Sequence, residues 1–215
     1  ARVDAGLGDP SGYFPDSDSA AAYTARAVNS PYGYDRVRAI QSLVRRLPGS
    51  ELQVIDFGGG DGALLKTIEV AAGTVHLIDV SPHMLKRAED LLARFDLKTY
   101  LGSVEQLASF ADGSVDLILC VNTLNYLEED LQQTFFVESH RILRRGGHLV
   151  VMTGNELLDL FSLNSGTLEF FRRNFGVEVG ELLNLADEAR WKNAGRLNPL
   201  GFGELLRNFG FVELE

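Results

Sequence analysis

Short apolar runs alternate with amphipathic stretches along most of this chain. The runs end at polar or glycine positions, as buried strands do, and the stretches between them repeat apolar residues at helical spacing. The pattern predicts strands over residues 52–57, 74–79, 98–101, 115–121, 148–153 and 211–214. Strands that alternate with helices through short connections indicate a parallel sheet with right-handed crossovers. We therefore predict an α/β fold with a doubly wound, mostly parallel sheet, flanking helices and the 52–57 strand at its centre.

Several of the expected helices have recognisable ends. A one-sided apolar stripe runs from Val37 to Leu47 and stops at Pro48–Gly49. Ser81–Pro82 has the residue types of an N-cap followed by the first helical position. Acidic residues at 128–130 favour a helix start, since they complement the helix dipole, and the Arg144–Gly147 run is expected to end that helix.

Two segments do not follow the alternation. Residues 1–34 are expected to form an N-terminal arm or lid, with a helix over 18–28 that the 29–34 segment breaks. Residues 155–200 are too long for a simple crossover and are expected to form a helical cap insertion. No linker or repeat divides the chain, so we expect a single domain over 1–215.

Composition narrows the range of partners. A hydrophobic fraction of 45% and a charged fraction of 23% are typical of a soluble globular protein. The net charge of −10 argues against a nucleic-acid partner, and no apolar run approaches the roughly 20 residues of a membrane span. One cysteine, Cys120, excludes an internal disulfide and fits a cytoplasmic protein, and the four scattered histidines predict no metal site.

The 52–62 segment, L-Q-V-I-D-F-G-G-G-D-G, predicts a strand that runs into a tight turn and a helix, which is a ligand site. Gly58-x-Gly60-x-x-Ala63 satisfies a dinucleotide-binding pattern. Carboxylates at Asp56 and Asp61 would instead repel a pyrophosphate and suit a cationic ligand. Asp79, at the end of the second predicted strand, is placed to accept hydrogen bonds from ribose hydroxyls, which fits either ligand.

Four segments taken together resemble the class I methyltransferases that use S-adenosylmethionine (SAM), small-molecule type. They are V-I-D-F-G-G-G-D-G at 54–62, H-L-I-D-V-S at 76–81, V-D-L-I-L-C-V-N-T-L-N-Y-L at 115–127 and R-I-L-R-R-G-G-H-L-V-V-M at 141–152. The resemblance covers roughly residues 37–215 and implies a Rossmann-like sheet with SAM as cofactor. The family's seventh, antiparallel strand has no counterpart before Glu215, so we expect a smaller sheet or a shortened chain.

The resemblance also implies which residues bind the cofactor: Asp56, Gly58, Gly59, Gly60, Asp79, Val80, Met84, Ser103, Val104, Cys120 and Asn122. Ribose is expected on Asp79, adenine near Val80, Met84 and Ser103–Val104, and the methionine end near Asp56 and 120–122. Family members often carry an aspartate where Ser103 stands, so that contact is expected to be weaker or supplied by Glu105. Met84 and Cys120 have a plain alternative as core side chains.

The catalytic residues are not identified by the sequence, and Asn122, Asn125 and Tyr126 are the candidates because they follow a strand end. The expected reaction is methyl transfer to an O or N atom of a small molecule, such as a sugar or natural-product intermediate. An NAD-dependent oxidoreductase and a non-catalytic SAM-binding module are the alternatives.

The acceptor is expected between the arm and the cap insertion. Aromatic and cationic residues gather in the insertion, at Phe170, Phe171, Arg172, Arg173, Arg190, Trp191, Lys192 and Arg196. They favour a flat or sugar-like acceptor that carries a negative charge, although they also fit the core and solvated face of a small helical cap.

Overall fold

The structure is a computed structural model that describes residues 31–47, 49, 51–68, 72–154, 169, 173 and 199–212. The predicted 18–28 helix and nearly all of the 155–200 cap insertion lie outside these residues. Arm residues 1–30, expected to contribute a lid, lie outside them as well. No helix of the described part is long and apolar enough to cross a membrane.

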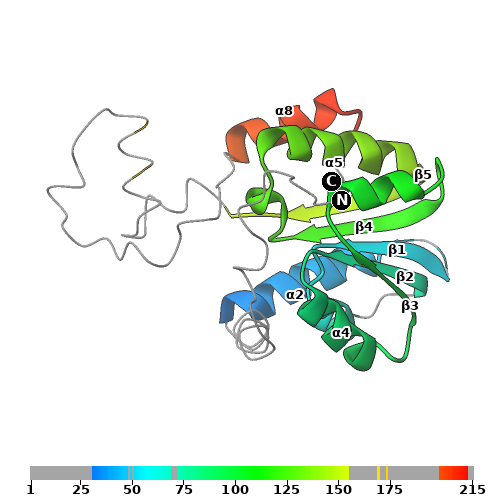
Figure 1. The fold of residues 1–215 in the computed structure, drawn as a ribbon. Coiled ribbons are helices and arrows are strands. Elements are labelled where there is room, and N and C mark those ends of the chain that lie inside the picture. Colours follow the sequence, from blue (N-terminus) through cyan, green and yellow to red (C-terminus); the bar gives the residue numbers. More distant parts are fainter. Residues whose placement is uncertain are drawn as a thin grey trace, which may run out of the picture.

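Five parallel strands form one sheet in the order β3-β2-β1-β4-β5 (Figure 1). Their bounds are β1 Leu52–Phe57, β2 Ala72–Asp79, β3 Asp96–Leu101, β4 Val115–Val121 and β5 Leu143–Met152. Every neighbouring pair is parallel. The predicted doubly wound α/β fold, with β1 at its centre, is therefore confirmed.

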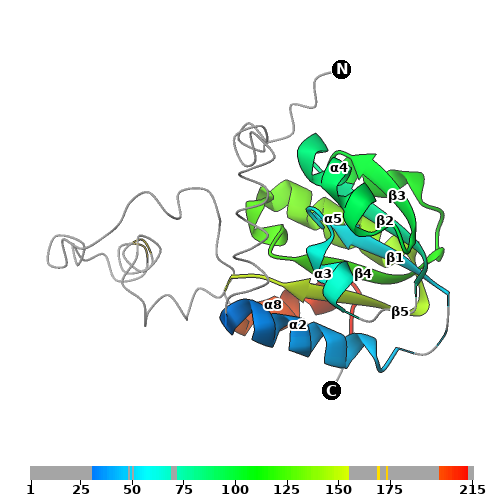
Figure 2. The same ribbon diagram turned by 90° about the horizontal axis from the view of Figure 1, so that it is seen from below.

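Helices cover both faces of the sheet, as Figures 1 and 2 show. One layer holds α2 (Pro31–Val44), α3 (Ala63–Thr67) and α4 (Pro82–Leu91), and the other holds η2 (Val104–Ser109), η3 (Leu124–Tyr126), α5 (Glu129–Ile142) and α8 (Pro199–Asn208). Successive β1 side chains enter opposite cores, because strand side chains alternate between faces: Val54 joins the first layer and Ile55 the second. Both layers are thus held to the same central strand.

Two predicted helix starts are confirmed, the first of them by a capping hydrogen bond. The Ser81 side chain accepts the Met84 N–H at 3.3 Å, and Pro82 occupies the first turn of α4. Glu128 is the N-cap of α5, and Glu129 and Asp130 lie in its first turn, where the helix dipole stabilises acidic groups. The two helices follow β2 and β4, which are parallel. The ends of these strands, and the polar residues between strand and helix, therefore lie at one edge of the sheet.

Several predicted boundaries were wrong: β2, β3 and β5 begin at 72, 96 and 143 instead of 74, 98 and 148, and two further differences concern α5 and the arm. The Arg144–Gly147 run does not end α5, because α5 ends at Ile142 and β5 begins at the next residue. Val115 pairs with Leu143 and Leu117 with His148, so the run forms a bulge inside β5, with Gly146 at φ 76°. The arm was also drawn too long: residues 31–34 are helical, and Pro31 suits the first turn of α2 because its missing N–H has no partner to lose there.

The chain end does not begin the sixth strand that we predicted. Phe211 and Val212 form no strand, and 213–214 lie beyond the described residues. The Phe211 ring instead packs edge-on against the His140 ring of α5, at 5.5 Å between centroids, and its N–H donates to the Leu206 carbonyl. Phe211 is thus held against α5 and α8, and within the described residues no strand is added beside β5.

Candidate functional site

Polar side chains gather at the carboxyl edge of the sheet, around the ends of β1, β2 and β4. The chain runs from β1 outward to β2 and β3 and then returns to place β4 on the other side of β1. Such a reversal leaves a crevice above the two strands that diverge, and open α/β sheets bind their ligands there. The glycine loop at 58–62 lies at this point.

The glycine loop is clamped between two side chains. A Cβ at Gly58 would lie 2.2 Å from the Thr123 side chain, and one at Gly59 would lie 2.5 Å from Asp56 Cγ. Gly58 also has φ 66°, a left-handed conformation that non-glycine residues rarely adopt. The Thr123 hydroxyl donates to the Gly58 carbonyl at 3.2 Å, which joins the end of β4 to the loop. The sequence did not single out Thr123, although this residue lies between two of the catalytic candidates, Asn122 and Asn125.

Asp79 links the end of β2 to the same loop. One carboxylate oxygen accepts the Gly60 N–H at 2.9 Å, and the other accepts the Ser81 N–H at 2.8 Å. Burial raises the pKa of this carboxyl, and the N–H donors oppose that rise. A carboxylate has about four lone-pair sites. Asp79 therefore keeps acceptor capacity for a ligand hydroxyl.

Asp56, near the end of β1, is a buried acid with an unsatisfied oxygen atom. Its side chain is 1% exposed, and its Oδ2 atom has no hydrogen-bond partner in the described part of the chain. Burial, together with the negative charge of Asp79, raises its pKa to about 7. A buried polar atom without a partner is uncommon in native proteins and calls for an explanation. A cationic ligand at this edge would provide one, since it would stabilise the ionised carboxylate.

Asp61 is not the free counter-charge that we expected. Arg87 of α4 pairs with its Oδ2, at 3.2 Å from Nη2, and the Ala63 N–H donates to its Oδ1 at 3.3 Å. A paired carboxylate therefore occupies the start of α3, where a dinucleotide pyrophosphate would have to bind. No local pattern signalled Arg87, which lies 26 residues from Asp61.

The predicted adenine side lies next to Asp79. Met84 is buried, with its sulfur 3.9 Å from a Cβ built at Gly60, and Val80 is half-buried. The Ser103 N–H donates to a Glu105 carboxylate oxygen at 2.7 Å, and the Gly102 N–H donates to the Asp79 carbonyl at 3.0 Å. The Glu105 carboxylate thus lies beside Ser103, the residue that was predicted to contact the adenine.

Not every predicted side chain faces this edge. Val104 and Cys120 are buried in the core beneath α5, so they could contact a ligand only through their main chain. Burial strongly raises the pKa of the Cys120 thiol, which argues against a nucleophilic thiolate.

The three catalytic candidates follow β4. Asn122 has a left-handed backbone, with φ 57°, and its N–H donates to the Met152 carbonyl at 2.7 Å. Asn125 is buried with an unpartnered Oδ1 atom, and the Tyr126 N–H donates to Thr123. Thr153, which follows β5 and was not a candidate, also has a buried hydroxyl oxygen without a partner.

Fold and site together define a class: a Rossmann-like domain whose glycine loop and buried carboxylates gather at the carboxyl edge of its sheet. Residues 55–151, from β1 to β5, match the family model for the methyltransferase domain. This match supports the class I SAM-dependent methyltransferase assignment that the sequence motifs predicted.

Known proteins agree with this assignment. The chain is 36% identical over 99 residues to a demethylmenaquinone methyltransferase of Tropheryma whipplei, covering 46% of this chain and 40% of the relative. It is 30% identical over 129 residues to a ubiquinone biosynthesis O-methyltransferase of Xanthomonas campestris, covering 59% and 52%. The chain thus spans about half the length of these curated relatives. The N-methyltransferase NodS of Bradyrhizobium japonicum, solved with S-adenosylhomocysteine (SAH), shares the fold, with a TM-score of 0.53, 22% identity and coverage of 63% and 71%.

Proposed function

We propose that this protein transfers a methyl group from SAM to an O or N atom of a small molecule. The observation that carries the proposal is the Asp79 carboxylate, which is bonded to the Gly60 and Ser81 N–H groups next to the unpartnered Asp56. The Asp79 carboxylate is an acceptor for a ribose hydroxyl, and the buried Asp56 carboxylate can pair with a positive charge. Both features suit a nucleoside that carries a sulfonium and an ammonium group.

The described residues fit SAM part by part. Asp79 would hold the ribose, and Asp56 would face the charged methionine end. Met84, Val80 and the Ser103–Glu105 corner would surround the adenine, with Glu105 as an acceptor for its amino group. NodS, which shares the fold, was solved with SAH, and this supports the same cofactor here. When bound, SAM supplies a methyl group already activated by its sulfonium.

A dinucleotide is less well accommodated. The Ala63 N–H, at the start of α3, already donates to Asp61 Oδ1 at 3.3 Å, so a pyrophosphate at that helix end would compete with the Asp61 carboxylate for it. The five residues of α3 also offer only a short helix for phosphate binding. These contacts favour SAM over NAD, whereas the third alternative, a non-catalytic SAM-binding module, is separated by turnover.

The protein's part in the reaction is to hold the two reactants in line. Positioning of this kind supplies roughly 7 to 11 kcal/mol of a barrier. In the balanced step, a lone pair of the acceptor O or N atom would form the new bond to the methyl carbon, the C–S bonding pair would remain on sulfur as SAH, and the acceptor proton would pass to solvent. Asn122, Asn125 and Tyr126 remain the proposed acceptor-side residues, because η3 and the β4 end adjoin the glycine loop through Thr123.

The acceptor is proposed at the level of chemical class. One curated relative is named for demethylmenaquinone and the other for ubiquinone biosynthesis, which supports a quinone-like ring as the acceptor, and the aromatic and cationic residues of 155–200 favour a flat, anionic acceptor. The predicted acceptor pocket between the arm and the insertion lies outside the described residues. It stays a prediction.

The test has two stages. Calorimetric titration with SAM, SAH and NAD should show binding of the first two and not of NAD, and NAD binding in place of SAM would contradict the proposal. Phenolic, amine and sugar acceptors are then incubated with SAM and examined by mass spectrometry for a gain of about one methylene mass. Turnover of at least one acceptor is expected. Cofactor binding without any turnover would favour the non-catalytic module.

A further inference from the structure

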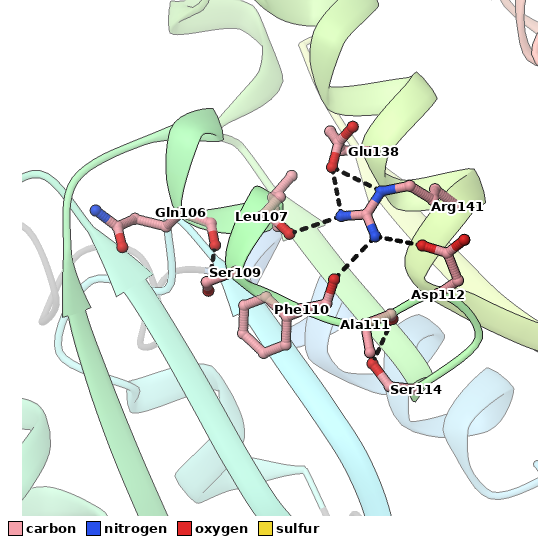
Figure 3. A network of polar contacts seen from close by, with 9 residues as sticks. All are labelled: Gln106, Leu107, Ser109, Phe110, Ala111, Asp112, Ser114, Glu138 and Arg141. Carbon is pink, nitrogen blue, oxygen red and sulfur yellow. Dashed lines mark hydrogen bonds and ion pairs between the residues drawn. The ribbon is translucent and has the colours of Figure 1, made fainter.

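Arg141, in the last turn of α5, is the centre of a polar network that joins α5 to η2 and to the turn after it (Figure 3). Its guanidinium donates to the Leu107 carbonyl at 3.2 Å and to the Phe110 carbonyl at 2.9 Å. It also bonds the Asp112 and Glu138 carboxylates, at 2.6 Å each. One side chain therefore ties the end of η2 and the turn after it to α5.

The tied segment is weak on its own. It comprises six residues of 3-10 helix, a form with poor hydrogen-bond geometry that is rarely longer than a few residues. The Leu107 carbonyl already accepts the Phe110 N–H at 3.2 Å, so Arg141 adds a second donor there and also donates to the Phe110 carbonyl beyond the helix end. The main chain adds one bond in return, from the Gly113 N–H to the Arg141 carbonyl at 3.0 Å. The Arg141 network therefore reinforces a segment that has few main-chain bonds of its own.

The opposite end of the same segment forms the proposed adenine corner. Ser103 precedes η2, and Glu105 in its first turn accepts the Ser103 N–H at 2.7 Å. The Gln106 N–H donates back to the Ser103 carbonyl, and the Gln106 side chain donates to the Leu101 carbonyl at 3.1 Å. Because η2 is so short, a shift at Leu107 moves the Glu105 carboxylate as well.

We propose that Arg141 is a positioning residue for the adenine end of the cofactor site, acting through η2. It touches no predicted ligand atom. It holds the Ser103–Glu105 corner beside Asp79 before the ligand arrives, so that binding does not have to order the segment. The inference rests on the proposed function, since it assigns a base-binding role to that corner.

The test compares two ligands that differ only in the base. SAH contains adenine, and S-ribosylhomocysteine keeps the ribose and amino-acid parts without it. If Arg141→Ala leaves the corner ordered in about a tenth of the molecules, SAH affinity falls roughly tenfold, because apparent affinity scales with the competent fraction. Affinity for S-ribosylhomocysteine should stay within about twofold of the wild-type value. Arg141→Lys, which keeps the charge but loses the fork of donors, should lie between Ala and wild type.

Arg144→Ala is the matched control. Arg144 is also an ion-paired arginine, but its partner Asp116 lies at the amino end of β4, away from the site. Amide hydrogen exchange of the ligand-free protein gives a second readout: residues 103–110 should exchange faster in Arg141→Ala, with β1 and β4 unchanged.

The outcomes are separable. A selective loss of SAH affinity with faster exchange at 103–110 supports the inference. Unchanged SAH affinity, or equal loss for both ligands, overturns it, because Arg141 would then be neutral or merely needed for the fold. Should Arg141→Ala fail to fold, the same comparison with Arg141→Lys decides. Wild-type protein that binds no SAH overturns the proposed function instead, and this inference with it.

Discussion

Replacement of Asp56 by asparagine tests whether the site contains a buried acid that lacks a counter-charge. In the ligand-free protein, the pKa of this carboxyl is raised from 3.8 to about 7, by burial first and by Asp79 second. A raised pKa means that the folded state holds the proton more tightly than the unfolded state. The contribution of Asp56 to stability is therefore complete below pH 3.8 and is lost as the pH rises to about 7.

The size of the effect follows from the same two values. A rise from 3.8 to about 7 corresponds to about 4 kcal/mol of stability lost at pH 8, and to about 2 kcal/mol already lost at pH 5. The asparagine side chain of the variant cannot ionise, and the cost of burying its amide is the same at every pH. The stability of Asp56→Asn relative to wild type should therefore rise by about 2 to 3 kcal/mol between pH 5 and pH 8.

The assay is urea unfolding of both proteins across that pH range, with the difference taken at each pH so that other titrating groups cancel. Asp79 and Cys120 are the ionisable neighbours, and both remain in the variant. Saturating SAM should flatten the wild-type pH dependence, because its positive charge favours the ionised Asp56. A stability difference that does not change with pH would refute the reasoning, because Asp56 would then titrate normally in the folded protein.

Three further substitutions probe the same edge. Asp79→Ala should weaken SAH binding at least tenfold by calorimetry, since charge-assisted bonds contribute roughly 1.5 to 3 kcal/mol each, and Asp96→Ala at the far end of β3 serves as its control; equal affinities would disprove the ribose assignment. Glu105→Gln should reduce the preference for SAH over its inosine analogue severalfold, and an unchanged ratio would remove Glu105 from the adenine site. Gly58→Ala should lower the free energy of unfolding by roughly 1 to 3 kcal/mol, because its Cβ would lie 2.2 Å from Thr123. Gly201→Ala, where a Cβ meets nothing within 4 Å, should not destabilise, and a similar loss at both glycines would contradict the clamp.

Most of the fold could be predicted from short sequence patterns. The apolar runs at 52–57 and 115–121 match β1 and β4 at both ends, because a strand buried on both faces needs a continuous apolar stretch. Ser81–Pro82 and Glu128 marked helix starts, since caps act within one turn of the residues that provide them. The candidate glycine loop and Asp79 were likewise found from spacing alone.

Tertiary structure decided which charges meet. Asp61 looked available to a ligand, but folding brings Arg87 from α4 to its carboxylate. Arg141 reaches carbonyls more than thirty residues earlier in the chain. Arg144–Gly147 looked like a helix end and became a bulge, because pairing with β4 takes up residues on either side of it. Sequence spacing predicts contacts within one turn or one strand, whereas these contacts depend on how separate elements pack, and only the packed structure brings them within bonding distance.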